Sequence, residues 1–113
     1  MNVSKDLVAA SATPLVLAIL REGDSYGYAI LKRVGELSGG ELQWTDGMLY
    51  PVLHRLQREG LLTSKWKTAE TDRKRKYYRL NARGKKALAA ERRQWFAVHQ
   101  TLAQFWGPKP CLT

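Results

Sequence analysis

Cysteine, acidic residues and long apolar runs are scarce in this chain, and each scarcity excludes a class of protein. Cys111 is the only cysteine, so no intrachain disulfide can form. The first 13 residues hold no apolar core of the kind that a secretory signal requires, and we therefore expect a reducing, cytoplasmic location. The longest uncharged apolar stretch, residues 14–20, is far shorter than the ~20 residues of a membrane span, which predicts a protein that does not cross a membrane.

Patterns typical of catalysis and metal binding are also missing from the sequence. His54 and His99 are the only histidines, and neither has a cysteine or carboxylate at the spacing of metal ligands. The sequence contains no glycine-rich phosphate loop and no serine in a nucleophile elbow. These absences predict a protein that is not an enzyme and that needs neither a metal nor a cofactor.

Positive charge is abundant. Nineteen lysines and arginines face 10 acidic residues, which gives a net charge of +9 and a pI near 10.0. A compact chain with this balance usually binds a polyanion, and without a membrane segment the expected partner is nucleic acid. At 113 residues the chain is one small unit, and proteins of this size often gain stability by pairing.

Capping residues and glycines divide the first half of the chain into three predicted helices. Ser4 can cap a first helix, in which Pro14 introduces a kink or a restart. Ser25 is expected to cap a second helix that ends at Gly39 and Gly40, and residues 45–60 form the third.

In the second half of the chain, the repeat of apolar residues changes from the helical period to the two-residue period of a β-strand. Residues 62–68 and 76–80 alternate between apolar and polar side chains, which predicts a β-hairpin with a charged tip at 69–74. Asn81 then caps a long helix over residues 82–106. The sequence therefore predicts a mainly α fold with a β-hairpin wing (α+β). We expect a winged helix-turn-helix domain over residues 1–81, a C-terminal dimerisation helix over 82–107 and a tail over 108–113.

The predicted third helix carries two residues that weaken helices, Gly47 and Pro51. At 100° per residue they share one face with His54 and Arg58, and the apolar residues of the segment lie opposite. Glycine places no side chain between the backbone and a partner, and proline leaves a carbonyl free for a ligand or solvent. Because helix N-termini attract phosphate, the pattern predicts a DNA-facing surface. The alternative is an outer face that is merely solvated.

The predicted hairpin carries six cations between residues 65 and 76, against only two acidic residues near its tip. Basic tips of this kind supply phosphate contacts that position a protein on DNA without reading the sequence. The alternative is a solvated, charged hairpin. The predicted DNA-binding residues, including one at the start of the second helix, are Tyr26, Thr45, Gly47, Tyr50, Pro51, His54, Arg55, Arg58, Lys65, Lys67, Arg73, Lys74, Arg75 and Lys76.

Three segments, YGYAILKRV, TDGMLYPVLHRLQREGLL and RKYYRLNARGKKAL, resemble the signature of PadR-family transcriptional regulators. The resemblance runs from residue 15 to about residue 88, with the motifs in order at spacings that suit a wing. It implies a homodimeric, DNA-binding winged-helix repressor, and the single last helix resembles the compact subfamily. The wing tip departs from the family pattern, because Thr71 and Asp72 stand where the family often has glycines.

The predicted last helix carries an apolar stripe of the kind seen in coiled coils. Its residues recur at steps of 7, 3, 4 and 3, and Glu91 fills the missing position. A chain this short offers no obvious partner for the stripe, so the sequence predicts a two-fold homodimer. The alternative is that the helix folds back on the first helix. The predicted dimerisation residues are Leu88, Trp95, Val98, Leu102 and Phe105.

Trp95 lies in the middle of this stripe, where a two-fold axis would bring it near its copy. Small residues on the facing part of the first helix leave room for a planar hydrophobic or cationic effector, which paired indoles would bind by stacking. Resemblance to compact PadR-like regulators, some of which bind aromatic drugs between paired tryptophans, implies the same. The alternative is that Trp95 is plain dimer core. The predicted effector-binding residues are Ala9, Ala12, Trp95, Phe96 and His99.

Together these features predict a sequence-specific transcriptional regulator that binds double-stranded DNA at an inverted-repeat operator. We expect a repressor that the effector releases from DNA. The rival interpretation is a sequence-neutral architectural or nucleoid protein, which would share the charge and the wing but would not discriminate between bases.

Overall fold

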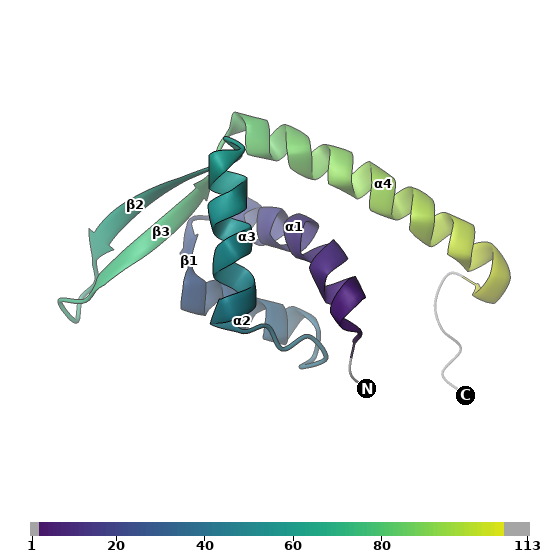
Figure 1. Cartoon of the computed structure of the whole chain (residues 1–113), viewed down its shortest axis with the longest axis horizontal. Helices are drawn as coiled ribbons and strands as arrows, with labels where there is room; N and C mark the ends of the chain where they lie inside the picture. The colour runs from purple at the N-terminus through teal and green to yellow at the C-terminus, as the bar shows by residue number, and fades with distance from the viewer. Residues whose placement is uncertain (1–2, 108–113) are drawn as a thin grey trace.

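The computed structural model describes residues 3–107 and has the predicted mainly helical architecture (Figure 1). The predicted tail, residues 108–113, lies outside the described residues. A three-stranded antiparallel sheet packs beside the first three helices, and the fourth helix follows the sheet. The elements in chain order are α1 (Lys5–Glu22), β1 (Ser25–Tyr26), α2 (Gly27–Leu37), α3 (Asp46–Arg58), β2 (Leu62–Thr68), β3 (Lys74–Leu80) and α4 (Ala82–Trp106).

The first and last helices begin at the predicted capping residues. Ser4 Oγ accepts a hydrogen bond from the Leu7 N–H at 3.2 Å, and Asn81 Oδ1 accepts one from the Gly84 N–H at 2.8 Å. Each bond satisfies a donor that the helix itself cannot pair. The predicted defect at Pro14 does not end α1, which runs through the proline as one helix.

The predicted cap at Ser25 is wrong, because this residue belongs to a short strand. Ser25 pairs with Tyr78 and Tyr26 with Tyr77, so β1 adds a third strand to the hairpin, in the order β1-β3-β2. Tyr26 is the N-cap residue of α2, and its side chain makes no capping hydrogen bond. Two residues are too few to show an alternating pattern, and only the tertiary pairing with β3 defines this strand.

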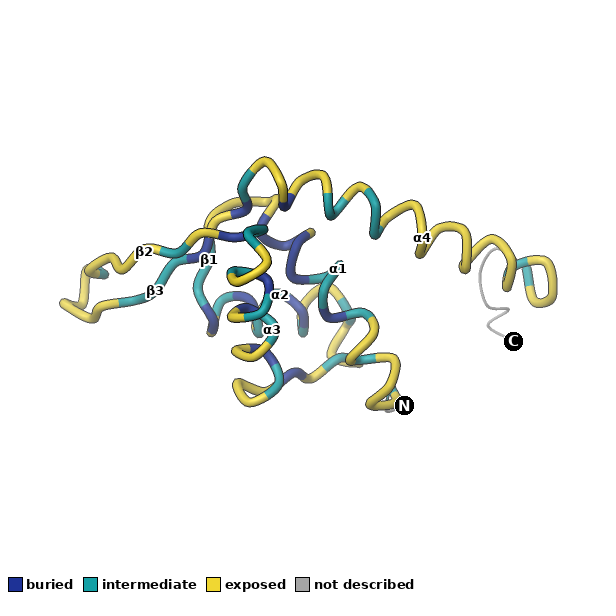
Figure 2. The backbone as a smooth tube through the Cα atoms, turned by 45° about the horizontal axis from the view of Figure 1, so that its top comes forward, coloured by how far each residue is buried: buried dark blue, intermediate teal, exposed yellow. Residues whose placement is uncertain are grey.

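The core lies where α1, α2, α3 and the inner end of the sheet meet. Figure 2 shows buried backbone concentrated there, while the hairpin tip and α4 are largely exposed. Gly84 fixes the approach of α4 to this core, because a Cβ at this position would collide with the carbonyl oxygen of Leu61 and with the side chain of Leu80. The wing and α4 extend from the core toward opposite ends of the molecule, which measures 51 × 29 × 21 Å (Figure 1).

Candidate nucleic-acid interface

α3 presents an exposed face that carries the residues predicted to lie there. Gly47, Pro51, His54 and Arg58 are all exposed, whereas the apolar face of the helix is buried. Pro51 has no N–H, so the carbonyl of Gly47 lacks the donor that a residue four positions later usually provides. A Cβ built on Gly47 would meet only Thr45 Oγ1, at 4.0 Å, among the described atoms. Packing therefore does not require glycine here, and the space beside the first turn of α3 is open to a partner.

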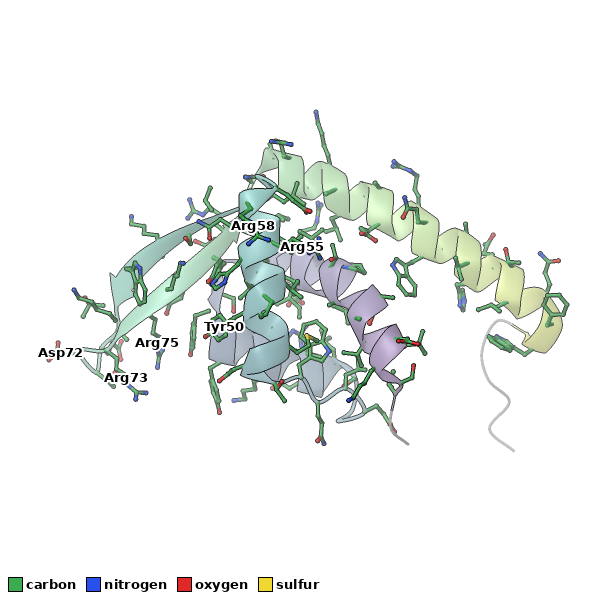
Figure 3. All side chains as sticks on the ribbon, viewed as in Figure 1. Tyr50, Arg55, Arg58, Asp72, Arg73 and Arg75 are labelled. Atoms are coloured by element: carbon green, nitrogen blue, oxygen red, sulfur yellow. The ribbon has the colours of Figure 1, made fainter. Side chains whose placement is uncertain are left out.

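Tyr50 and His54 occupy the middle of this face. Their ring centroids lie 6.3 Å apart, and the Tyr50 side chain points toward the wing side of α3 (Figure 3). The Tyr50 hydroxyl lies against Gly27, where any Cβ would collide with it. Gly27 therefore allows an aromatic side chain from α3 to reach the first turn of α2.

Arg55, which the sequence analysis placed among the DNA-binding residues, lies on a different face. Its Nη2 donates to Thr13 Oγ1 of α1 at 2.6 Å, and its Nη1 lies 3.4 Å from both carboxylate oxygens of Glu59. Five positions after Tyr50, Arg55 is rotated by about 140° around the helix axis, which directs it toward α1. We correct the prediction accordingly: Arg55 joins α3 to α1.

The cations of the wing divide between its two faces. In the antiparallel register, Lys67 lies opposite Arg75 and Trp66 lies opposite Lys76. Directly opposite residues share a face, and successive residues alternate between faces. One face therefore carries Lys65, Lys67 and Arg75, and the other carries Lys74, Lys76 and Trp66.

Aromatic contacts attach the root of the wing to β1. The rings of Tyr26 and Tyr77 meet edge to face, with centroids 5.2 Å apart. The guanidinium carbon of Arg75 lies 4.4 Å from the centroid of Tyr26, and Lys67 Nζ lies 4.9 Å from that of Tyr77. These cation–π contacts hold two wing cations in place without neutralising them. Tyr26 thus positions the wing, and its own contact with DNA stays a prediction.

The wing tip closes without glycine. The Ala69 N–H donates to the Arg73 carbonyl at 2.7 Å, and the Asp72 N–H donates to the Ala69 carbonyl at 3.0 Å. Asp72 adopts the left-handed region, with φ of 61°, which aspartate tolerates better than most residues other than glycine. The tip therefore makes a tight turn that presents Arg73, although the glycines typical of such turns are missing.

Ion pairs neutralise some of the cations near this surface. Arg79 Nη2 lies 2.8 Å from Asp24 Oδ2, and its hydrogen bonds hold the pKa of Asp24 below the ordinary value. Arg33 lowers the pKa of Glu22 in the same way, across 2.7 Å. Within residues 3–107, no ion pair engages the wing-tip cations, residues 73–76. Their charge is available to a partner.

α4 covers α1 only along its first half. Leu88 packs against the core, whereas the other four residues of the predicted stripe are exposed, as Figure 2 shows for this part of α4. The exposed fractions are 36% for Trp95, 53% for Val98, 40% for Leu102 and 85% for Phe105. The alternative in which α4 folds back along α1 therefore accounts for Leu88 but leaves most of the stripe without a partner in one chain.

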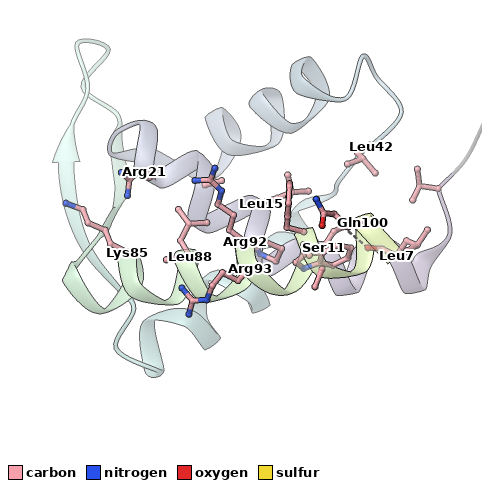
Figure 4. Close-up of a pocket in the computed structure, with 17 residues that line it drawn as sticks. Leu7, Ser11, Leu15, Arg21, Leu42, Lys85, Leu88, Arg92, Arg93 and Gln100 are labelled. Carbon is pink, nitrogen blue, oxygen red and sulfur yellow. Dashed lines mark hydrogen bonds between the residues drawn. The ribbon is translucent and has the colours of Figure 1, made fainter. Parts of the chain in front are cut away.

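An open groove of about 1400 Å³ lies between α1 and α4 (Figure 4). Trp95 and Phe96 line it, but the three other predicted effector residues do not. Ala12 is buried in the core, Ala9 lines a separate depression, and His99 is exposed outside the groove. Positions 9 and 12 lie on other faces of α1, and this corrects the prediction. The α1 wall of the groove consists instead of Leu7, Ser11, Pro14, Leu15 and Ala18.

Comparison with known proteins identifies the family. The sequence model of the transcriptional regulator PadR-like family matches residues 16–90, which include α2, α3 and the whole wing. The chain belongs to the PadR-like family. It is accordingly a winged-helix, DNA-binding transcriptional regulator, as the sequence predicts.

Similar structures and sequences agree with this PadR-like assignment. A transcriptional regulator from Clostridium thermocellum is 28% identical and superposes with a TM-score of 0.81 over 89% of this chain and 98% of its own. A PadR family regulator from Clostridium difficile is 30% identical, with a TM-score of 0.75 over 86% of this chain and 99% of its own. The transcriptional regulator Rv3488 of Mycobacterium tuberculosis is 41% identical over 58 residues, which are 51% of this chain and 53% of that protein.

One large side chain of the PadR-like wing, Trp66, has a position that the sequence did not indicate. Trp66 is 63% exposed, although it shares the alternation phase of the buried Leu62. Trp66 does lie on the same face of β2 as Leu62, but β2 continues beyond the core, so this face of the wing is uncovered at Trp66. The two adjacent tyrosines of β3 also differ in burial: Tyr78 is buried in the core, whereas Tyr77 packs on Tyr26.

Two absences concern only the part of the chain that the structure describes. No helix within residues 3–107 is long and apolar enough to cross a membrane. In the same range, no group of three histidine, cysteine or acidic side chains could hold a metal ion.

Proposed function

We propose that this PadR-like regulator is a sequence-specific repressor, in which the exposed face of α3 reads an operator through the major groove. The observation that carries this proposal is the uncovered backbone at Gly47. Because glycine has no side chain, the first turn of α3 can approach base edges closely. Tyr50, His54 and Arg58 follow on the same face and supply aromatic and hydrogen-bonding groups. The wing cations add phosphate contacts that hold the protein on either specific or nonspecific DNA.

Selection of binding sites from a random duplex library, followed by footprinting, tests this proposal. We expect an inverted repeat whose half-site centres lie about one helical turn, or a small multiple of it, apart. A library that yields no preferred sequence would instead support the architectural or nucleoid alternative. A footprint over a single asymmetric half-site would argue against the two-fold arrangement.

The proposed assembly is a homodimer that pairs the exposed stripe of α4 with its copy. Trp95, Val98, Leu102 and Phe105 offer apolar surface that the single chain leaves in water. Burial of such residues between two helices is the usual source of stability in coiled-coil seams. A dimer would also place two copies of the α3 face on one duplex, which the inverted-repeat operator requires.

The proposed effector site is the groove between α1 and α4, with Trp95 and Phe96 as aromatic walls. Among the described residues, four cations and no carboxylate line the groove, so its charge favours a neutral or anionic planar ligand over the cationic one also considered from the sequence. Its cationic residues are Arg21, Lys85, Arg92 and Arg93 (Figure 4). A ligand there would release DNA only if it bound more tightly to a dimer conformation in which the spacing of the two α3 helices does not fit the operator.

Titration of wild type and Trp95→Ala with neutral, anionic and cationic planar dyes, together with dimer mass, tests the groove. Unchanged dye affinity in a dimeric Trp95→Ala protein would contradict the effector site. Loss of the dimer in this variant would show that Trp95 is part of the dimer core.

A further inference from the structure

A second cleft lies between the wing and the N-terminal turns of α2 and α3. Its walls carry the aromatic side chains of Tyr28, Tyr50 and Trp66, and its rim carries four consecutive cations, residues 73–76. No aspartate or glutamate is among the residues that line it. Apolar ring faces beside uncompensated positive charge suit a chain of alternating sugars and phosphates.

α2 begins at this cleft without a side-chain cap. The side chain of its N-cap, Tyr26, makes no capping bond, and the first turn contains no acidic residue. The first N–H groups of a helix and its macrodipole together attract an anion. Gly27, the first residue of α2, lines the cleft, so this backbone is within reach of a ligand.

Tyr78, which lines the same cleft, carries an unpaired hydrogen-bond donor. Tyr78 is only 1% exposed, and its buried hydroxyl has no hydrogen-bond partner among the described residues. Burial raises the pKa of Tyr78, so the hydroxyl keeps its proton at neutral pH. A buried hydroxyl without a partner is destabilising, and a ligand oxygen that accepted its hydrogen bond would remove this cost.

The position of the cleft indicates its occupant. In a winged-helix complex α3 enters the major groove and the wing lies along the neighbouring backbone, so one DNA strand passes between them. We propose that the cleft seats this strand. One phosphate would accept hydrogen bonds from the first N–H groups of α2 and from the Tyr78 hydroxyl, and the Trp66 indole would pack against the next deoxyribose. Tyr50 would turn away from Gly27 toward the bases as the phosphate enters.

This inference rests on the proposed function only in its choice of duplex DNA as the partner. It adds three contacts, namely the indole of Trp66, the hydroxyl of Tyr78 and the backbone N–H groups that begin α2, a region where the sequence analysis named only Tyr26. These contacts meet the backbone, so their removal should weaken operator and scrambled duplexes alike. A variant of the α3 face should instead lose the preference for the operator over the scrambled duplex. The failure of one proposal can therefore be distinguished from the failure of the other.

The contact of Trp66 is tested by fluorescence and affinity. We expect DNA to change the tryptophan emission of wild type and of Trp106→Phe, a control at the far end of α4, but not that of Trp66→Phe. Trp66→Ala should lower affinity about tenfold for both duplexes, a loss typical of a side chain that stacks on nucleic acid. An undiminished emission change in Trp66→Phe, or wild-type affinity in Trp66→Ala, would overturn the role of Trp66.

The contact of Tyr78 is tested by separating stability from binding. Tyr78→Phe removes only the unpaired hydroxyl, so its unfolding midpoint should equal or exceed that of wild type, while its affinity for both duplexes falls about tenfold. Tyr77→Phe, outside the cleft, should bind as wild type does. Methylphosphonate substitution removes the charge of one phosphate at a time along the operator. At one phosphate per half-site, this substitution should lower the affinity of wild type for DNA but not that of Tyr78→Phe. Wild-type affinity in Tyr78→Phe would overturn the phosphate site, and a wild type that binds neither duplex would overturn both proposals.

Discussion

Replacement of Gly47 by alanine should stabilise the protein and weaken its binding to the operator. Gly47 is the second residue of α3, and its φ is not in the left-handed region. A Cβ there meets nothing closer than 4.0 Å, so alanine fits without strain. Glycine within a helix costs about 0.5–1 kcal/mol relative to alanine, and a gain of that size corresponds to a rise in Tm of about 2–4 °C.

The same methyl group would project from the face of α3 that we propose contacts DNA. If the backbone of α3 approaches the major groove closely, the added carbon should cost about 1.4 kcal/mol of binding free energy, or tenfold in operator affinity. Calorimetric unfolding and fluorescence anisotropy with a labelled operator measure the two effects separately. Opposite changes in stability and affinity are expected because packing and DNA contact place different demands on this residue.

Gly35→Ala provides a matched control. Gly35 lies within α2, and a Cβ there has no neighbour within 4 Å. This variant should gain similar stability and bind the operator as wild type does. If Gly47→Ala were more stable and also bound the operator with wild-type affinity, the close approach of α3 would be refuted.

Three further variants test the contact between α3 and α1, the α4 seam and the pairing of Asp24 with Arg79. Arg55→Ala should lower the free energy of unfolding by about 1 kcal/mol, because the hydrogen bond to α1 is lost. It should leave the ratio of operator affinity to scrambled-duplex affinity unchanged, and a reduced ratio would show that Arg55 contacts DNA. Leu102→Glu should yield a monomer in sedimentation experiments, whereas Leu37→Glu, at a more exposed leucine on α2, should not; a dimeric Leu102→Glu would contradict the α4 seam. Asp24 has a pKa below its ordinary 3.8, so its pairing with Arg79 contributes stability that is complete above pH 3.8 and is lost as the pH falls further. Asp24→Asn should therefore lose less stability than wild type as the pH is lowered. An unchanged loss of stability at low pH would refute this pairing.

The helices and the hairpin could be predicted from the sequence because their signals are local. Ser4 and Asn81 cap helices through residues three positions away, and the alternation of the wing strands follows from their own side chains. Strand β1 could not be predicted this way, since its two residues become a strand only by pairing with β3, some 50 positions later.

The candidate sites show the same division between local and tertiary information. The outward face of α3 follows from the helical period, and the exposure of Gly47 agrees with it. Arg55 was misplaced because its partner, Thr13, lies 42 positions away in sequence. Trp66 was missed because the alternation of a strand does not indicate where the core beneath it ends. The groove has Leu7 and Leu15 beside the small residues Ser11 and Ala18 of α1, since only the docking of α4 defines which stripe of α1 faces it.

We infer above all that the face of α3 between Gly47 and Arg58 reads a specific DNA sequence. The most direct measurement is the affinity of the wild-type protein for its selected operator relative to a scrambled duplex of the same length at physiological salt. We expect a ratio of about 10³ or more, which the wing alone cannot produce because phosphate contacts carry no sequence information. Equal affinity for the two duplexes would contradict the claim and identify a sequence-neutral DNA-binding protein.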